Sequence, residues 1–174
     1  MEQLLAEDKY QVVSFDLEYI GDRPGYDQKV VVAQLCMLHH ILVYHYFLAT
    51  RPCERFARFV NSHDYRFAMV DTIKDLKVLE TLGLACQKLV DIQGQYRFRG
   101  IKKEKDSLAD LAMSVIDPYY TSLKDECKNN NTTWHNAWVQ RLDEGHVKYV
   151  AKDAYASYEM YMQTINIGSA FVLP

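Results

Sequence analysis

The sequence predicts an α/β fold in which helices flank a mixed central sheet of about five strands. Three runs of β-branched and other apolar residues open the chain, at residues 12–19, 29–37 and 40–47, and such runs are typical of strands. Segments with helical spacing of apolar residues then alternate with two shorter apolar runs, as in α/β proteins. No linker divides the 174 residues. We therefore expect a single domain, residues 1–174, large enough for a full core.

The first half of the chain is expected to begin with a three-stranded meander. Its first strand starts Val-Val-Ser-Phe, which favours burial on both faces. Phe56, Phe59 and Val60 repeat at helical spacing after Pro52 and predict a helix there. The remaining predicted elements are a strand at 66–70, a helix from Thr72 to the stop signal Gly83, and a strand at 88–92.

The second half is expected to be mainly helical. Ser107-x-x-Asp110 has the form of a capping box and predicts the start of a helix that Pro118 ends. Asp143 is the expected N-cap of a final helix that runs to about Thr164.

Composition narrows the class of protein. The formal net charge of -3 argues against a broadly basic nucleic-acid coat but allows a local basic groove. Four cysteines form no CxxC or CxxH pair, and Cys36 lies in an apolar run that suits a buried thiol. The first nine residues lack a signal-peptide core, and no run of 18 apolar residues could cross a membrane. We expect no membrane partner and an intracellular protein of the nucleus or cytoplasm, not a secreted one.

Two acids end the first strand with one residue between them. Side chains alternate across a strand, so Asp16 and Glu18 project from the same face. Neighbouring carboxylates repel each other unless a cation lies between them, so this spacing favours a divalent metal. The alternative is a pair of solvated acids at a strand end.

Three further residues complete the set of candidates. Asp75 lies near the start of the helix after the fourth strand, and Tyr149 and Asp153 share one face of the last helix. Taken alone, Asp75 would be interpreted as the acid of a Thr72-x-x-Asp75 capping box. Tyr149 and Asp153 alone would fit the surface of an amphipathic helix.

Together these motifs resemble a known family. The segments are Ser14–Tyr19, Val32–Cys36, Val70–Lys77, Ser107–Ala112 and Tyr149–Tyr155. In this order they resemble the 3′→5′ exonucleases of the ribonuclease-H-like superfamily with an Asp-Glu-Asp-Asp signature and a tyrosine. The resemblance extends from about Val12 to Thr164 and is greatest to the exonuclease domain of the Werner syndrome helicase and its plant relatives. It implies a ribonuclease-H-like fold and a nuclease that releases nucleoside monophosphates, with DNA favoured and RNA possible.

The resemblance also implies roles for the residues. Asp16, Glu18, Asp75 and Asp153 would hold two ions, and their oxygen ligands suit Mg²⁺ or Mn²⁺. Two such ions can clamp the attacking and leaving oxygens of an in-line displacement. Asp16, Glu18 and Tyr149 are the expected catalytic residues. Because a tyrosine has an ordinary pKa of about 10, Tyr149 is expected to orient water rather than to act as a base.

Nucleic acid is the expected partner, and the sequence leaves the identity of any protein partner open. The only strongly basic segment runs from Tyr96 to Lys105, and its Tyr96 and Phe98 could stack on bases. A solvated loop is the alternative. The candidate substrate contacts are Leu17, Arg97, Arg99, Lys102 and Lys103.

Some residues bear on functions other than that of an exonuclease. His39, His40 and His45 have no acid or cysteine partner at suitable spacing, which argues against zinc. His146 and Val150 depart from the family pattern of glutamine and alanine, and the residues before Asp75 lack the usual glycine. These departures leave open an exonuclease-fold module with little turnover that binds protein or nucleic acid.

Overall fold

The computed structural model describes residues 2–20, 29–70, 72–98, 107–120 and 138–170. In this part of the chain the strands are β1 (Val12–Ile20), β2 (Lys29–Met37), β3 (His40–Tyr44), β4 (Arg66–Met69) and β5 (Leu89–Asp91). The helices are α1 (Glu2–Glu7), α2 (Glu54–Val60), α3 (Thr72–Thr81), α4 (Ile92–Phe98), α5 (Leu108–Val115), the 3-10 turn η1 (Pro118–Tyr120) and α8 (Glu144–Ala170).

The five strands form one mixed sheet in the order β3-β2-β1-β4-β5. The predicted meander is confirmed, since β2 pairs antiparallel with both β1 and β3. On the other side β1 pairs parallel with β4, and β4 pairs parallel with β5. The strand that carries Asp16 and Glu18 is therefore the middle of the sheet.

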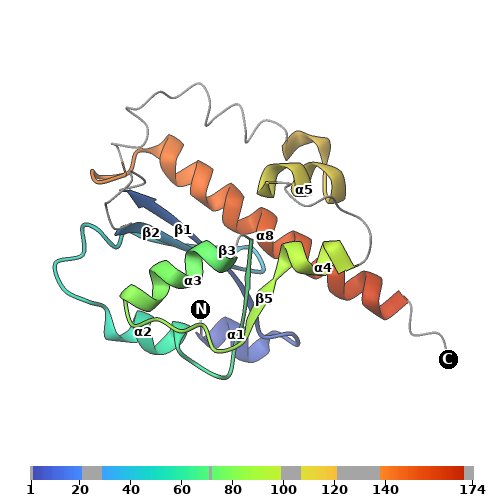
Figure 1. Ribbon diagram of the computed structural model, residues 1–174, viewed down its shortest axis with the longest axis horizontal. Helices are drawn as coiled ribbons and strands as arrows, with labels where there is room; N and C mark the ends of the chain where they lie inside the picture. Colours follow the sequence, from blue (N-terminus) through green and yellow to red (C-terminus); the bar gives the residue numbers. More distant parts are fainter. Residues whose placement is uncertain (1, 21–28, 71, 99–106, 121–137, 171–174) are drawn as a thin grey trace.

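Helices cover both faces of the sheet (Figure 1). Alternate residues of β1 point in opposite directions. Val13, Phe15 and Leu17 pack in a core with side chains of α1, α2 and α3. The opposite face of β1 and β2 lies under α8, where Ala154 and Tyr158 pack on Cys36. Burial of β1 on both faces is confirmed by the buried run from Val12 to Phe15.

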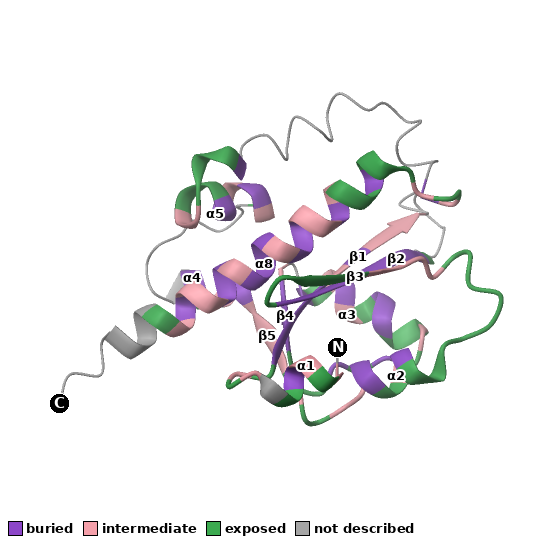
Figure 2. Cartoon of the chain, turned by 180° about the vertical axis from the view of Figure 1, so that it is seen from behind, coloured by how far each residue is buried: buried purple, intermediate pink, exposed green. Residues whose placement is uncertain are grey.

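α8 is the longest element and crosses the sheet (Figures 1 and 2). Its buried residues recur at helical spacing and face the sheet and α5. None of the helices in the described ranges is both long enough and apolar enough to cross a membrane.

Both predicted helix starts are confirmed by their caps. Ser107 Oγ accepts a hydrogen bond from Asp110 N (3.3 Å), and the Asp110 carboxylate accepts one from Ser107 N (3.0 Å). These two bonds form the capping box of α5. Asp143 Oδ1 accepts from His146 N (2.9 Å) at the start of α8. α8 continues to Ala170, beyond the predicted end near Thr164.

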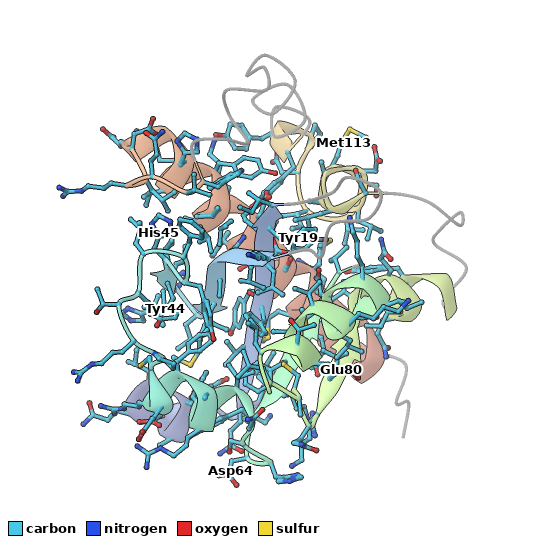
Figure 3. All side chains as sticks on the ribbon, turned by 60° about the vertical axis from the view of Figure 1, so that its left-hand side comes forward. Tyr19, Tyr44, His45, Asp64, Glu80 and Met113 are labelled. Atoms are coloured by element: carbon cyan, nitrogen blue, oxygen red, sulfur yellow. The ribbon has the colours of Figure 1, made fainter. Side chains whose placement is uncertain are left out.

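The third strand is shorter than predicted, because β3 ends at Tyr44 and the chain turns at residues 46–48. The His45 ring nitrogen Nε2 lies 2.8 Å from Trp138 O, and Phe47 N donates to Val31 O (3.1 Å). At the end of β3 lies Tyr44, which Figure 3 labels beside His45. Its ring stacks on Phe56, with centroids 4.8 Å apart. These tertiary contacts end the strand where the apolar run alone would continue it.

The proposed base-stacking role of Tyr96 is wrong. The fifth strand ends at Asp91, and α4 follows at once. The Tyr96 side chain is fully buried, and its hydroxyl donates to Met160 O of α8 (2.7 Å). Tyr96 therefore belongs to the core. Burial of its large ring is favourable, and its hydroxyl has a hydrogen-bond partner there, although basic residues follow it in the sequence. α1 was not predicted either; it is a six-residue helix whose Leu5 is fully buried.

Candidate active site

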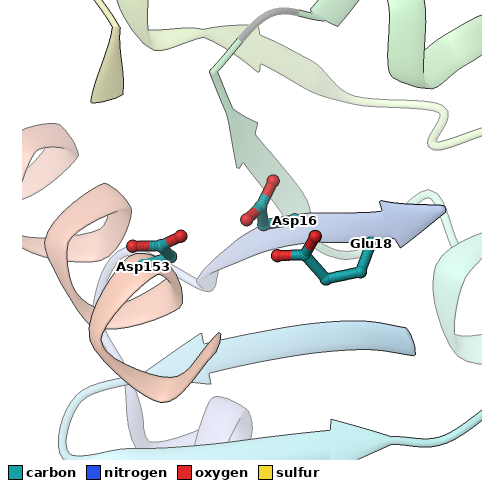
Figure 4. Close-up of side chains that lie close together, drawn as sticks. All are labelled: Asp16, Glu18 and Asp153. Atoms are coloured by element: carbon teal, nitrogen blue, oxygen red, sulfur yellow. The ribbon is translucent and has the colours of Figure 1, made fainter. Parts of the chain in front are cut away.

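Three carboxylates meet where β1 passes under α8 (Figure 4). Asp16 and Glu18 project from the same face of β1, and Asp153 approaches from α8. One ligand oxygen of each residue lies within 4.8 Å of those of the other two. Asp16 and Glu18 thus share one face of β1, as alternation along a strand predicts, and the fold brings Asp153 to them.

A short polar contact holds α8 against β1 at this point. Ser14 lies two residues before Asp16, and its buried hydroxyl donates to the carbonyl of Ala154 (2.6 Å). Ala154 directly follows Asp153. The bond therefore holds the strand and the helix close together within two residues of Asp16 and Asp153.

An irregularity of the sheet lies beside Glu18. Glu18 pairs with Val32 and Tyr19 pairs with Val30, so Val31 is an extra residue in β2. Val31 and Val32 consequently pack in the same cluster, with Trp138 and Val150. Bulges of this kind bend a strand and redirect its side chains, and they are frequent next to active sites.

Burial and mutual repulsion raise the pKa of the acids of β1. Both carboxyl groups of β1 are surrounded by protein, although their side chains keep some accessible surface. Burial raises the pKa of Asp16 from 3.8 to about 6, against hydrogen bonds from the Leu17 backbone and Gln34. Burial also raises the pKa of Glu18 well above its ordinary value, and the charges of Asp16, Asp153 and Asp75 add to this. A cation would relieve both effects.

Asp75 lies at the edge of this cluster. It is buried in the first turn of α3, where the helix dipole favours a carboxylate. Its charge acts on Glu18, but it is not one of the three acids grouped within 4.8 Å. The structure thus brings three of the four predicted ligands together and places the fourth close by.

Tyr149 lies one turn before Asp153 on α8. Its half-buried ring packs beside Trp138, with centroids 6.2 Å apart. The same face of the helix therefore carries the tyrosine and the acid, as the spacing of four residues predicts.

The candidate substrate contacts do not lie with the acids among the described residues. Leu17 points to the opposite face of β1 from the acids and is only 6% exposed, within the main core. Its side chain is therefore packed away from the acids, and a contact of Leu17 with substrate stays a prediction. Arg97 lies in α4, but its side chain, like Arg99, Lys102 and Lys103, lies outside the described residues.

Two lysines next to the acids contact aromatic rings. Lys74 Nζ lies 4.9 Å from the centre of the Tyr19 ring, and Lys152 Nζ lies 5.5 Å from that of Tyr119. Each lysine thus makes a cation–π contact.

Sequence reasoning gave no role to Gln34 and Ser14. Gln34 Nε2 donates to Asp16 Oδ2 (3.1 Å), and Gln34 is fully buried. The available signal was a polar residue with apolar neighbours: Ser14 lies between Val13 and Phe15, and Gln34 lies within the apolar run from Val30 to Met37.

The raised pKa of Asp16 predicts that Asp16→Asn increases the free energy of unfolding of the metal-free protein, and that the increase depends on pH. The folded pKa lies above 3.8, so this acid's contribution to the free energy of unfolding decreases as pH rises from about 4 to 7. The substitution should change little at pH 4 and stabilise the protein at pH 8, by at most roughly 3 kcal/mol. At about 2–4 °C per kcal/mol, thermal denaturation in EDTA would detect this.

Asp143→Asn is the control of opposite sign. Hydrogen bonds from His146 lower the pKa of Asp143 below 3.8, so its loss should destabilise the protein at pH 8 and matter less only as pH falls below 3.8. Equal effects of Asp16→Asn at both pH values would contradict the proposed cost of ionising Asp16.

Comparison with known proteins identifies the fold. No model of a protein family matches the sequence, and no curated protein sequence matches it. Solved structures do match. The EXO domain of Nibbler from Aedes aegypti is 14% identical, with a TM-score of 0.70 over 99% of this chain and 86% of that one.

Two bacterial structures also share the fold. Escherichia coli RNase D, an exoribonuclease involved in structured RNA processing, is 19% identical, with a TM-score of 0.74. The match covers 97% of this chain and 42% of RNase D. Brucella melitensis NrnC with bound Mg²⁺ is 12% identical, with a TM-score of 0.70, over 91% of this chain and 73% of that one. NrnC also has a structure bound to pGG. The chain therefore has the fold of the exonuclease domains of the ribonuclease-H-like superfamily, as the sequence predicts.

Proposed function

We propose that this chain is a metal-dependent 3′→5′ exonuclease that hydrolyses phosphodiester bonds in nucleic acid and releases nucleoside monophosphates. One observation carries the proposal: Asp16, Glu18 and Asp153 come together from β1 and α8, in a fold whose solved neighbours include exonucleases. In this proposal residues 1–174 form a single exonuclease domain.

The chemistry of the cluster fits Mg²⁺ or Mn²⁺. All three grouped ligands are carboxylate oxygens, which hard divalent cations prefer. Burial and repulsion raise the pKa of Asp16 and Glu18, so a cation would stabilise their ionised forms. The neighbour NrnC is known with bound Mg²⁺. Asp75, whose charge acts on Glu18, is the fourth ligand in a two-ion arrangement.

The residues of the chain have separate roles. Asp16, Glu18, Asp75 and Asp153 would hold the ions. When bound, two ions supply positive charge at the attacking and leaving oxygens of an in-line displacement. Tyr149 orients the attacking water through its hydroxyl, on the same helix face as Asp153. Ser14 keeps that helix at a fixed distance from β1 through the Ala154 carbonyl.

The substrate is DNA or RNA with a free 3′ end. The resemblance to the Werner-type exonuclease favours DNA, whereas the neighbour RNase D is an exoribonuclease. The free thiols Cys36, Cys53 and Cys86 suit a reducing compartment such as the nucleus or cytoplasm.

Digestion of end-labelled substrates tests the proposed reaction. With Mg²⁺ or Mn²⁺, 5′-labelled DNA or RNA should shorten stepwise, and 3′-labelled strands should release labelled mononucleotide at once. Single- and double-stranded forms of each define the preference. EDTA, Asp16→Ala and Asp153→Ala should each abolish turnover, because each removes a cation or one of its ligands.

A near-normal rate in purified Asp16→Ala would contradict the two-ion proposal. Binding of metal and nucleic acid without cleavage of any substrate would instead support a module with no useful turnover.

Tyr149→Phe tests the proposed orientation of water. The change deletes one hydroxyl and keeps the ring beside Trp138, so we expect a rate loss of about 10- to 1000-fold with little change in substrate affinity. Single-turnover kinetics would measure it. Tyr158 is a buried tyrosine of the same helix, so Tyr158→Phe is the matched control and should keep the rate of the parent. An unchanged rate in Tyr149→Phe would leave Tyr149 as a packing residue.

The basic segment is tested by the salt dependence of binding. A protein with a net charge of -3 needs a local positive surface to hold a polyanion, and we assign this to Arg97, Arg99, Lys102 and Lys103. Arg97→Ala with Arg99→Ala should weaken binding at low salt and flatten log Kd against log salt by about 0.7 per lost contact to a single strand. Catalysis on saturating substrate should change little.

The double variant Arg51→Ala with Arg58→Ala serves as the control, because it removes as much positive charge as the Arg97 and Arg99 variant. Arg51 precedes α2, Arg58 lies within it, and both are exposed. Parallel lines for the Arg97 and Arg99 variant and the parent would mean that the segment does not contact phosphate.

A further inference from the structure

Gln34 is a fully buried amide in an otherwise apolar strand. It lies in β2 directly opposite Asp16 of β1. Apart from Gln34, the residues of β2 from Val30 to Met37 are apolar and buried. Burying an amide is costly unless hydrogen bonds compensate it, so the reason for this residue must lie in its partners.

Those partners are the acids of β1. Gln34 Nε2 donates to Asp16 Oδ2 (3.1 Å). A hydrogen bond from the same side chain also acts on Glu18 and opposes the rise of its pKa. An amide nitrogen carries two N–H donors, so one group can serve two carboxylates that lie two residues apart.

We propose that Gln34 is the positioning residue of the metal site, and this inference rests on the proposed function. By holding one side of the Asp16 and Glu18 carboxyl groups, the amide fixes their rotamers and leaves the remaining oxygens directed toward Asp153. Partners behind metal ligands orient them in this way, and their loss typically weakens metal binding by about 10- to 100-fold.

The neutral charge of the amide suits this role. A lysine at the same position would satisfy the carboxylates but would also neutralise the charge that attracts a cation. A further acid would add to the repulsion that already acts on Glu18. Glutamine donates hydrogen bonds and leaves the negative charge of the cluster intact.

Gln34→Met is the informative variant. Methionine has a similar length and shape and no donor. Because Gln34 Oε1 accepts no hydrogen bond from the described residues, the change leaves no donor on that side unpaired. Mn²⁺ and Mg²⁺ titrations by calorimetry, without nucleic acid, should show about 10- to 100-fold weaker binding. At fixed metal, kcat should decrease while KM for nucleic acid stays the same.

Thr164→Val is the matched control. Thr164 is also a buried polar residue, but its hydroxyl donates to Tyr161 O within α8 (2.7 Å), eleven positions after Asp153. Its loss should lower the melting temperature without changing metal affinity. This control separates positioning of the ligands from a general loss of stability.

The outcomes are distinguishable. Parent-like metal affinity in folded Gln34→Met would overturn the role of Gln34 while leaving the nuclease proposal intact. Failure of the parent to bind either metal would overturn the proposed function itself. If Gln34→Met does not fold, Gln34→Leu gives the same reading of metal affinity.

Discussion

The repulsion between Asp16, Glu18 and Asp153 has to be overcome by the packing around them. Their ligand oxygens lie within 4.8 Å of one another, and burial strengthens the repulsion because little water screens it. The three carboxylates stay together because β1 and α8 are each held by contacts of their own. A cluster that lowers the stability of the metal-free protein is what a cation site requires.

β1 is rigid because it lies in the middle of the sheet. It pairs with β2 on one side and β4 on the other, and Phe15 packs between Phe56 and Phe67 on the face away from the acids. α8 is held by Ser14 through the Ala154 carbonyl and by Tyr96 through the Met160 carbonyl. Two hydroxyls, one from a strand and one from a helix, thus fix α8 at points six residues apart.

Low sequence identity with a shared fold has a physical explanation here. Identities of 12–19% accompany TM-scores near 0.7. A sheet covered by helices on both faces needs apolar residues at the right period and few particular ones. The acids obey a stricter condition, because a shift of one residue in β1 would turn Asp16 and Glu18 to the opposite face.

The sequence by itself determined the features that depend on neighbours along the chain. Alternation placed Asp16 and Glu18 on one face, and the caps at Ser107 and Asp143 marked two helix starts. Tertiary structure alone decided the rest. The end of β3 before His45, the burial of Tyr96 and the contact of Gln34 with Asp16 depend on residues 18 to 93 positions away. Such contacts form only when packing brings distant segments together, and no local period or cap signals them.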